Sequence, residues 1–164
     1  MEPLVSSDFI ISDVFEFATT IRERTDVQFT RLVSVDVDSL FTNFPVLETI
    51  DIILNRLFPN KNSAVHGMDR SRFESLLKLA VTDSYFTFDE QLYRQIDGVA
   101  MGSPLEPIFA NIFMNAHEGR WLNECPVKPL LYRRYVDDTL LIFRETDNLA
   151  DFVSFLNALP PFHL

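Results

Sequence analysis

Hydrophobic residues recur along this chain with two different spacings, which predicts a mixture of helices and strands. Val14, Phe17 and Ile21 lie three or four positions apart, so we expect a helix over residues 12–24. Over residues 31–38, valines alternate with polar residues, which is the period of a strand with one buried face. Asp36 and Asp38 are therefore expected on the face opposite to the valines.

The same reasoning predicts the remaining elements. We expect Ser12 to cap the first helix, and a capping box at residues 71–74 to begin another. Further helices are expected at 45–58, at 107–122 and from Asp147, and strands at 85–88, 92–96, 130–136 and 139–143. Strands that pair through short hairpins between helices favour an α+β fold, with an antiparallel sheet and helices packed on one of its faces.

Composition and charge narrow the class of protein. The 164 residues are 47% hydrophobic, which suits one folded domain or a piece of a larger one. The net charge of −10 argues against a free-standing nucleic-acid binder with a basic surface. The single cysteine, Cys125, allows no internal disulfide and no cysteine-based zinc site.

We expect a nuclear or cytoplasmic protein that is not secreted. A reducing compartment suits a chain with one cysteine. The N-terminal residues lack the basic start and apolar run of a signal peptide. No apolar stretch approaches the length of a membrane span, so no membrane association is expected.

The most unusual local feature is the sequence YVDD at 135–138. Asp137 and Asp138 are adjacent carboxylates expected at the turn of an apolar hairpin, where they repel each other. A bound cation, a basic partner or water would relieve that repulsion. Aspartate is also a common turn residue, so an ordinary solvated turn explains the pair equally well.

Two further segments carry candidate chemistry. Asp36 lies near the end of the strand predicted at 31–38, where a carboxylate is often only a turn residue. Gly98 and Gly102 fall close together with two prolines, directly before the helix predicted at 107–122. A plain loop accounts for the glycines and prolines on their own.

Taken together and in order, these segments resemble the palm of a reverse transcriptase. The strings that carry the resemblance are SVDVDSLFTNFP (34–45), DGVAMGSPL (97–105) and YRRYVDDT (132–139). They are similar to the reverse transcriptases of Penelope-like retroelements, a group allied to telomerase. The resemblance runs from about residue 7 to 156. It implies a partial reverse transcriptase domain over 1–164, with a palm core at about 30–158.

The resemblance implies an RNA-directed DNA polymerase, which transfers deoxynucleotides to a primer 3′-hydroxyl by a two-metal mechanism. Asp36, Asp137 and Asp138 would be the catalytic and metal-binding carboxylates, and the backbone carbonyl of Val37 would face the nucleotide-bound ion. Two Mg²⁺ ions are the expected cofactors, with Mn²⁺ as the alternative, because both are hard cations that take oxygen ligands.

The resemblance also implies contacts to the substrates. Phe41 would lie under the sugar and disfavour ribonucleotides, although a phenylalanine at this position is equally suited to a core. Met101 and Gly102 would approach the incoming nucleotide or the template. Arg133, Arg134 and Tyr135 are the expected nucleic-acid contacts. The two arginines would reach primer phosphates or offset the catalytic carboxylates, and a plain solvated pair is an equal alternative.

The expected partners are an RNA template, a DNA primer and deoxynucleoside triphosphates. Fingers, thumb and endonuclease segments would belong to a longer protein, because the fingers and thumb are largely missing from the palm-like pattern. The chain departs from the family pattern at Glu106, where a small residue is usual, and at Asp38, where an apolar residue is usual. A carboxylate near a template strand would repel its phosphates.

Two other functions compete with the polymerase. A truncated, non-catalytic remnant of a retroelement, acting only as an interaction fragment or not at all, would keep the same motifs. A viral RNA-directed RNA polymerase shares the two-metal palm, but Phe41 and the YVDD string argue against it. We expect weak or no polymerase activity from residues 1–164 alone.

Overall fold

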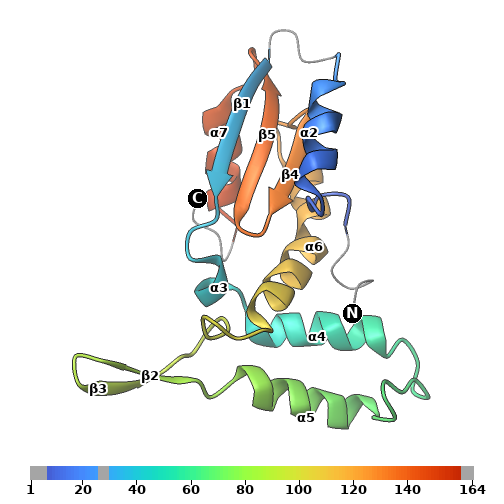
Figure 1. The fold of residues 1–164 in the computed structure, drawn as a ribbon, viewed down its shortest axis with the longest axis vertical. Coiled ribbons are helices and arrows are strands. Elements are labelled where there is room, and N and C mark those ends of the chain that lie inside the picture. The colour runs from blue at the N-terminus through green and yellow to red at the C-terminus, as the bar shows by residue number, and fades with distance from the viewer. Residues whose placement is uncertain (1–6, 26–29, 160–164) are drawn as a thin grey trace. The chain divides into compact units, whose positions relative to one another are not determined.

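The computed structural model describes residues 7–25 and 30–159, which form two units. One unit is Ser39–Ala116, and the other consists of the described residues before Ser39 and after Ala116. The ends of the predicted domain, 1–6 and 160–164, lie outside the described residues. In chain order the elements are α2 (Val14–Arg22), β1 (Thr30–Asp36), α3 (Leu40–Asn43), α4 (Val46–Leu57), α5 (Arg70–Val81), β2 (Tyr85–Phe88), β3 (Gln91–Arg94), α6 (Glu106–Glu124), β4 (Leu131–Tyr135), β5 (Asp138–Arg144) and α7 (Leu149–Asn157) (Figure 1).

A three-stranded antiparallel sheet forms the centre of the second unit. Its strand order is β1-β5-β4, so the last strand of the β4–β5 hairpin lies in the middle. The register runs from Thr30 opposite Arg144 to Asp36 opposite Asp138. On the other side of β5, Tyr135 lies opposite the same Asp138. The predicted mixed fold with antiparallel pairing is therefore confirmed.

One face of this sheet carries the hydrophobic core of the unit. Leu141 and Phe143 of β5 are fully buried and pack with Phe152 of α7 and with Cys125, which follows α6. The Phe143 and Phe152 rings meet edge to face, with centroids 4.9 Å apart. Burying each such side chain contributes roughly 1.5–3 kcal/mol, so this layer accounts for much of the stability of the sheet.

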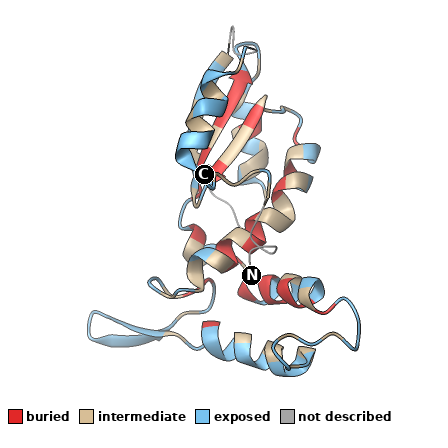
Figure 2. Ribbon diagram, turned by 45° about the vertical axis from the view of Figure 1, so that its right-hand side comes forward, coloured by how far each residue is buried: buried red, intermediate tan, exposed pale blue. Residues whose placement is uncertain are grey.

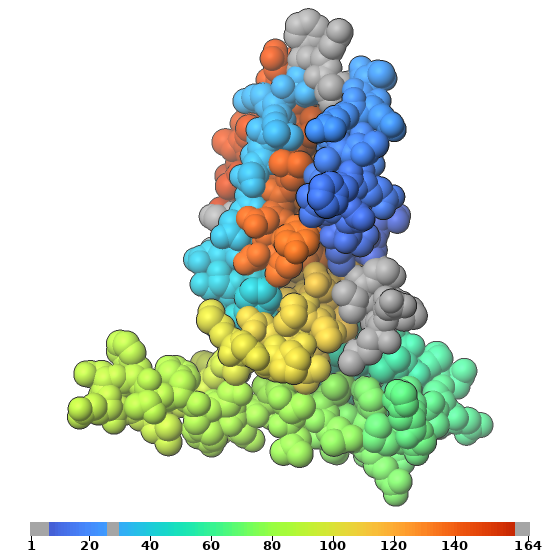
Figure 3. All heavy atoms as spheres, in the orientation of Figure 1, coloured from blue at the N-terminus to red at the C-terminus, as the bar shows by residue number. Residues whose placement is uncertain are grey.

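The other face of the sheet is only partly covered. Arg133 of β4 lies beside Glu16, Phe17 and Thr20 of α2, so that helix covers the β4 side. The expectation that helices pack on one face of the sheet is thus wrong, because α2 lies beside Arg133 on the face opposite to the core (Figure 1). On the β1 side Leu32 remains 67% exposed. Figure 3 shows atoms of β1 and β5 at the surface of this unit beside α2.

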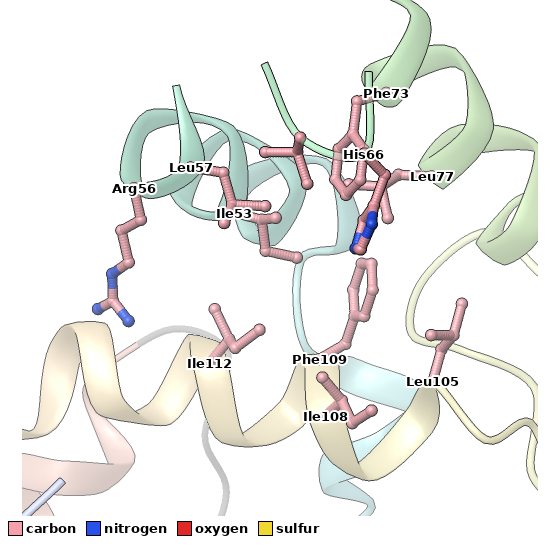
Figure 4. A pocket seen from close by; sticks show the side chains of 11 residues that line it. Ile53, Arg56, Leu57, His66, Phe73, Leu77, Leu105, Ile108, Phe109 and Ile112 are labelled. Carbon is pink, nitrogen blue, oxygen red and sulfur yellow. The ribbon is translucent and has the colours of Figure 1, made fainter. Parts of the chain in front are cut away.

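In the first unit, α4, α5 and the first part of α6 surround an apolar interior. Phe44 and Phe113 are buried and stack with centroids 6.3 Å apart. A cavity of about 530 Å³ remains in this unit, and Figure 4 shows side chains from α4, α5 and α6 pointing into it. Its wall is apolar apart from Arg56 and His66.

The β2–β3 hairpin of the same unit is exposed along its whole length. Every residue of both strands is exposed, which Figure 2 shows as an unbroken pale blue ribbon. Phe86 and Tyr93 are cross-strand partners that stack with centroids 5.6 Å apart.

Among the described residues, no helix combines the length and apolar character needed to cross a membrane.

The element boundaries differ from the predicted ones in informative places. The first helix is capped by the carboxylate of Asp13 rather than by Ser12, and α5 by Asp69 rather than by a box beginning at Ser71. Aspartate and serine cap helix N-termini equally well, so the sequence alone offered two possible capping residues at the start of each of these two helices. The short helix α3 was not predicted. Strand β1 ends at Asp36, which leaves Asp38 in the following turn.

Candidate active site

Two carboxylates lie opposite each other at one end of the three-stranded sheet. Asp36 is the last residue of β1 and Asp138 is the first residue of β5, and they are direct partners in the antiparallel register. Opposed residues project to the same face, with Cβ atoms about 4.5–5.5 Å apart. Both residues are exposed to solvent. The structure therefore brings together two acids that are far apart in the sequence.

This pairing is unfavourable for the fold by itself. Like charges placed directly opposite each other destabilise a sheet. The cost is of the same order of magnitude as the gain from a favourable cross-strand pair, roughly 0.2–1 kcal/mol. Replacing either aspartate with a polar neutral residue would remove the repulsion without disturbing the core. The stability of the fold therefore does not explain the pair, which makes the two carboxylates candidates for binding.

Asp137 lies beside this pair, in the two-residue turn that joins β4 to β5. The turn consists of Val136 and Asp137, whereas the sequence predicted Asp137 and Asp138 as the turn residues. The backbone N–H of Val37 donates to the Asp137 carbonyl at 3.3 Å, which ties the turn to the residue after β1. All three predicted catalytic carboxylates thus belong to one end of one sheet.

The turn contains a strained residue. Val136 has φ of +60°, a left-handed conformation that is rare for a β-branched side chain. An L-residue in this region costs roughly 1–2 kcal/mol relative to its ordinary conformations. Strain of this kind persists only where the surrounding structure holds it.

A buried arginine holds this turn. Arg134 has no exposed side-chain surface, and its Nη1 donates to the Val136 carbonyl at 2.7 Å. Its Nε donates to the Glu118 carboxylate of α6 at 2.6 Å and its Nη2 to the other oxygen at 3.3 Å. The expected contact of Arg134 with nucleic acid is therefore wrong, and so is the solvated alternative, because a fully buried guanidinium reaches neither phosphates nor bulk water.

Tyr132 completes the buried group. Its hydroxyl donates to the same Glu118 carboxylate at 2.7 Å. Burial, reinforced by the charge of Glu118, raises the pKa of Tyr132 well above 10, so the phenol stays protonated and keeps donating. Sequence reasoning missed Glu118. The available signal was a charged residue in register with Met114, Trp121 and Cys125, which are buried at helical spacing.

The other two predicted nucleic-acid contacts lie on the less covered face. Tyr135 is 53% exposed and is the register partner of Asp138. Arg133 is half-buried beside α2, and its Nη1 donates to the Tyr132 carbonyl at 2.8 Å. Their contacts with nucleic acid remain predictions.

The predicted nucleotide-binding residues belong to the first unit. Phe41 is half-buried, and its carbonyl accepts the N–H of Val99 at 3.0 Å. Gly98 makes this close approach feasible, because a Cβ there would lie 2.2 Å from the Phe41 carbonyl oxygen. Gly98 is thus a structural requirement of the glycine-rich segment that the sequence did not distinguish from a plain loop residue.

Glu106 has a local structural explanation. Its carboxylate accepts the backbone N–H of Gly102 at 2.8 Å, which closes the turn before α6. Gly102 has φ of +86°, a conformation that favours glycine. Met101 beside it is 73% exposed. The departure from the family pattern at Glu106 therefore serves this turn.

The donor chemistry at the sheet end fits a hard divalent cation. Across residues 7–25 and 30–159, no three His, Cys, Asp or Glu side chains are gathered closely enough to hold a metal ion. Mg²⁺ commonly takes only one or two protein carboxylates and completes its shell with water and phosphate oxygens. The opposed Asp36 and Asp138 supply that number, and the arrangement with Asp137 as a third ligand remains a prediction.

The comparisons with known proteins give the fold and no closer relationship. No protein-family model matches the chain, and no curated protein matches it. Among solved structures, apo telomerase from Candida tropicalis matches with a TM-score of 0.65 and 16% identity, over 96% of this chain and 32% of that one. The same telomerase truncated from its C-terminal domain matches with a TM-score of 0.64 and 17% identity, over 92% of this chain and 32% of that one.

A third match is telomerase from Candida albicans in complex with a TWJ fragment of telomeric RNA. It has a TM-score of 0.63 and 12% identity, over 91% of this chain and 28% of that one. The chain thus spans about a third of the length of these structures. Telomerase is a reverse transcriptase, so the chain is similar in fold to a part of that kind of enzyme.

Proposed function

We propose that this chain is the palm part of an RNA-directed DNA polymerase of the Penelope-like retroelement type. The proposal combines the motif order in the sequence with the fold likeness to telomerase. The observation that carries it is the pairing of Asp36 with Asp138, two like charges held opposite each other beside the strained turn that contains Asp137. An arrangement that is unfavourable for folding suits a site that binds cations.

The proposed reaction is nucleotidyl transfer. The 3′-hydroxyl oxygen of a primer attacks the α-phosphorus of a deoxynucleoside triphosphate and loses its proton to water. A new P–O bond forms, and pyrophosphate leaves with the electrons of the broken P–O bond. Bound Mg²⁺ or Mn²⁺ ions would stabilise the attacking and leaving oxygens. Asp36, Asp137 and Asp138 would hold these ions, with the Val37 carbonyl facing the nucleotide-bound ion.

The remaining assignments concern the substrates. Phe41 would exclude the 2′-hydroxyl of a ribonucleotide, and the exposed Met101 with Gly102 would face the nucleotide or template. Tyr135 and Arg133 would face the primer. The telomeric RNA fragment in one telomerase match supports RNA as a partner, and its use as a template is part of the proposal. With its net charge of −10, this chain would need further segments to supply most of the phosphate-binding surface.

Metal binding by the purified 164-residue chain tests the site. Free Mn²⁺ is followed by electron paramagnetic resonance during titration of the chain. We expect binding that is lost in Asp138→Asn and retained in Asp89→Asn, a matched control that removes one charge from the turn of the other hairpin. Equal Mn²⁺ binding by the two variants would remove the carboxylate site from the proposal.

Activity tests the function itself. We expect RNA-templated primer extension from the protein encoded by the whole reading frame, and its loss in Asp137→Asn with the fold intact. Weak or no extension is expected from the 164 residues alone. An inactive full protein would favour the alternative of a non-catalytic remnant. Retained extension by Asp137→Asn, with normal Mg²⁺ dependence, would contradict the assignment of the catalytic carboxylates.

A further inference from the structure

The buried ion pair of the second unit needs an explanation beyond stability. Arg134 and Glu118 are 0% and 1% exposed, with 2.6 Å between Arg134 Nε and Glu118 Oε1. Apolar residues of similar volume usually stabilise a core as well as such a pair, because burying two charges is unfavourable. A role other than stability is therefore indicated where a buried ion pair makes a contact that no apolar side chain can make.

That contact is the hydrogen bond from Arg134 Nη1 to the Val136 carbonyl, at 2.7 Å. The Val136 carbonyl belongs to the peptide plane that joins Val136 to Asp137. Because a peptide plane is rigid, a fixed carbonyl direction also fixes the backbone of Asp137 on its N-terminal side. The bond thus acts on the residue that presents the predicted catalytic carboxylate.

The arginine itself is anchored from several sides. Its backbone N–H donates to the Phe9 carbonyl at 2.7 Å, and its carbonyl accepts the N–H of Ile11 at 2.8 Å. Its guanidinium is gripped by both oxygens of Glu118. Because these contacts fix the position of the Arg134 guanidinium, its hydrogen bond to the Val136 carbonyl sets the position of the turn.

We infer that Arg134, oriented by Glu118, is a positioning residue that holds the Val136–Asp137 turn in the conformation needed to bind the divalent cation. This inference rests on the proposed function and adds to it a residue pair that does not touch substrate. Groups that orient a metal ligand from behind typically change metal affinity by about 10- to 100-fold when they are replaced.

The test compares Arg134→Lys with Tyr132→Phe in the 164-residue chain. Lysine keeps the charge beside Glu118 but is a point donor that cannot serve the carboxylate and the Val136 carbonyl together. Tyr132→Phe removes a hydrogen bond to the same Glu118 and leaves the Arg134 contacts in place. Two readouts are measured: the affinity for Mn²⁺ alone, and the exchange rate of the Val37 amide, which donates to the Asp137 carbonyl.

We expect Arg134→Lys to weaken Mn²⁺ binding by about 10-fold or more and to speed exchange of the Val37 amide, while Tyr132→Phe changes neither. Unchanged values in Arg134→Lys, or equal changes in both variants, would reduce the pair to a purely structural role. Should Arg134→Lys fail to fold, Glu118→Asp replaces it, because it keeps both charges and withdraws the carboxylate by one methylene. Unchanged Mn²⁺ affinity in Glu118→Asp would then overturn the inference.

The outcome separates this inference from the proposed function. Wild-type chain that binds no Mn²⁺ contradicts the proposed site. Faster Val37 exchange in Arg134→Lys would in that case still show that the arginine holds the turn. Wild-type chain that binds Mn²⁺ with an affinity insensitive to Arg134 keeps the proposed site and removes the positioning role.

Discussion

The two hairpins of this protein have turns of the same length but are held in different ways. In the β2–β3 hairpin the turn residues Asp89 and Glu90 have φ of +48° and +59°, and all the strand residues are exposed. In the β4–β5 hairpin the turn contains Val136 with φ of +60°, and the carbonyl of this valine is bound by the buried Arg134. One turn depends on its own residues, and the other on an arginine of its own hairpin that is anchored to α6 through Glu118.

The difference shows where tertiary structure overrides local preference. Two consecutive positive φ angles suit the right-handed twist of a hairpin, and aspartate tolerates them better than most residues. Valine does not, so the conformation of the β4–β5 turn is maintained by the side chain of Arg134, which lies outside the turn in β4. A turn held in this way is positioned more firmly than a turn that depends only on its own sequence. This is the property that a catalytic carboxylate requires.

The largest expected effect comes from replacing one arginine in each hairpin. Arg134→Met leaves Glu118 buried without its partner, so we expect a loss of about 3–5 kcal/mol in the free energy of unfolding. Arg94→Met in β3 removes an exposed pair with Asp83 at 3.8 Å and should cost less than about 1 kcal/mol. Urea unfolding of the wild type and both variants measures these two losses in the free energy of unfolding. Similar losses would show that the two hairpins are held in the same way.

An intermediate effect is expected at alkaline pH. The folded-state pKa of Tyr132 is raised above its unfolded value of about 10, first by burial and then by the Glu118 charge. Its contribution to stability is therefore complete below about pH 10 and is lost as the pH rises through the folded pKa. The free energy of unfolding should fall more steeply with pH in the wild type than in Tyr132→Phe. Parallel curves would contradict a buried phenol beside a carboxylate.

The smallest expected effect comes from relieving the strain in the turn. Val136→Asn should raise the free energy of unfolding by up to about 1 kcal/mol, because asparagine adopts a positive φ at lower cost than valine. Glu90→Asn in the exposed hairpin should change it by less than about 0.5 kcal/mol. Thermal unfolding of the wild type and both variants measures these two changes in stability. A destabilised Val136→Asn protein would mean that valine packing outweighs the strain.

Much of the fold followed from the periodicity of the sequence. The β2–β3 hairpin was predicted closely because alternation and a polar two-residue turn are local signals. The ends of α2 and α5 were not, since Asp13 competes with Ser12 and Asp69 with Ser71 for the same capping role. Helix α3 was missed because four residues are too few for a hydrophobic period.

The candidate site shows the same division. Asp137 and Asp138 stood out as adjacent acids, and the family resemblance added Asp36. The role of Arg134 was misjudged because an arginine in a predicted strand gives no local sign of the direction of its side chain. Its partner Glu118 lies sixteen residues earlier, on a different element. Only the packing of α6 against β4 makes them a pair.

The amino-acid sequence by itself determined most of the elements, the hairpin that closes through its own residues, and the acids available for chemistry, because each of these depends on neighbours along the chain. Tertiary structure alone decided that Asp36 lies opposite Asp138, and that a buried arginine holds a valine in a left-handed turn. Both depend on register and burial between segments far apart in the sequence. Cross-strand pairing and desolvation act through space, and no local pattern records them.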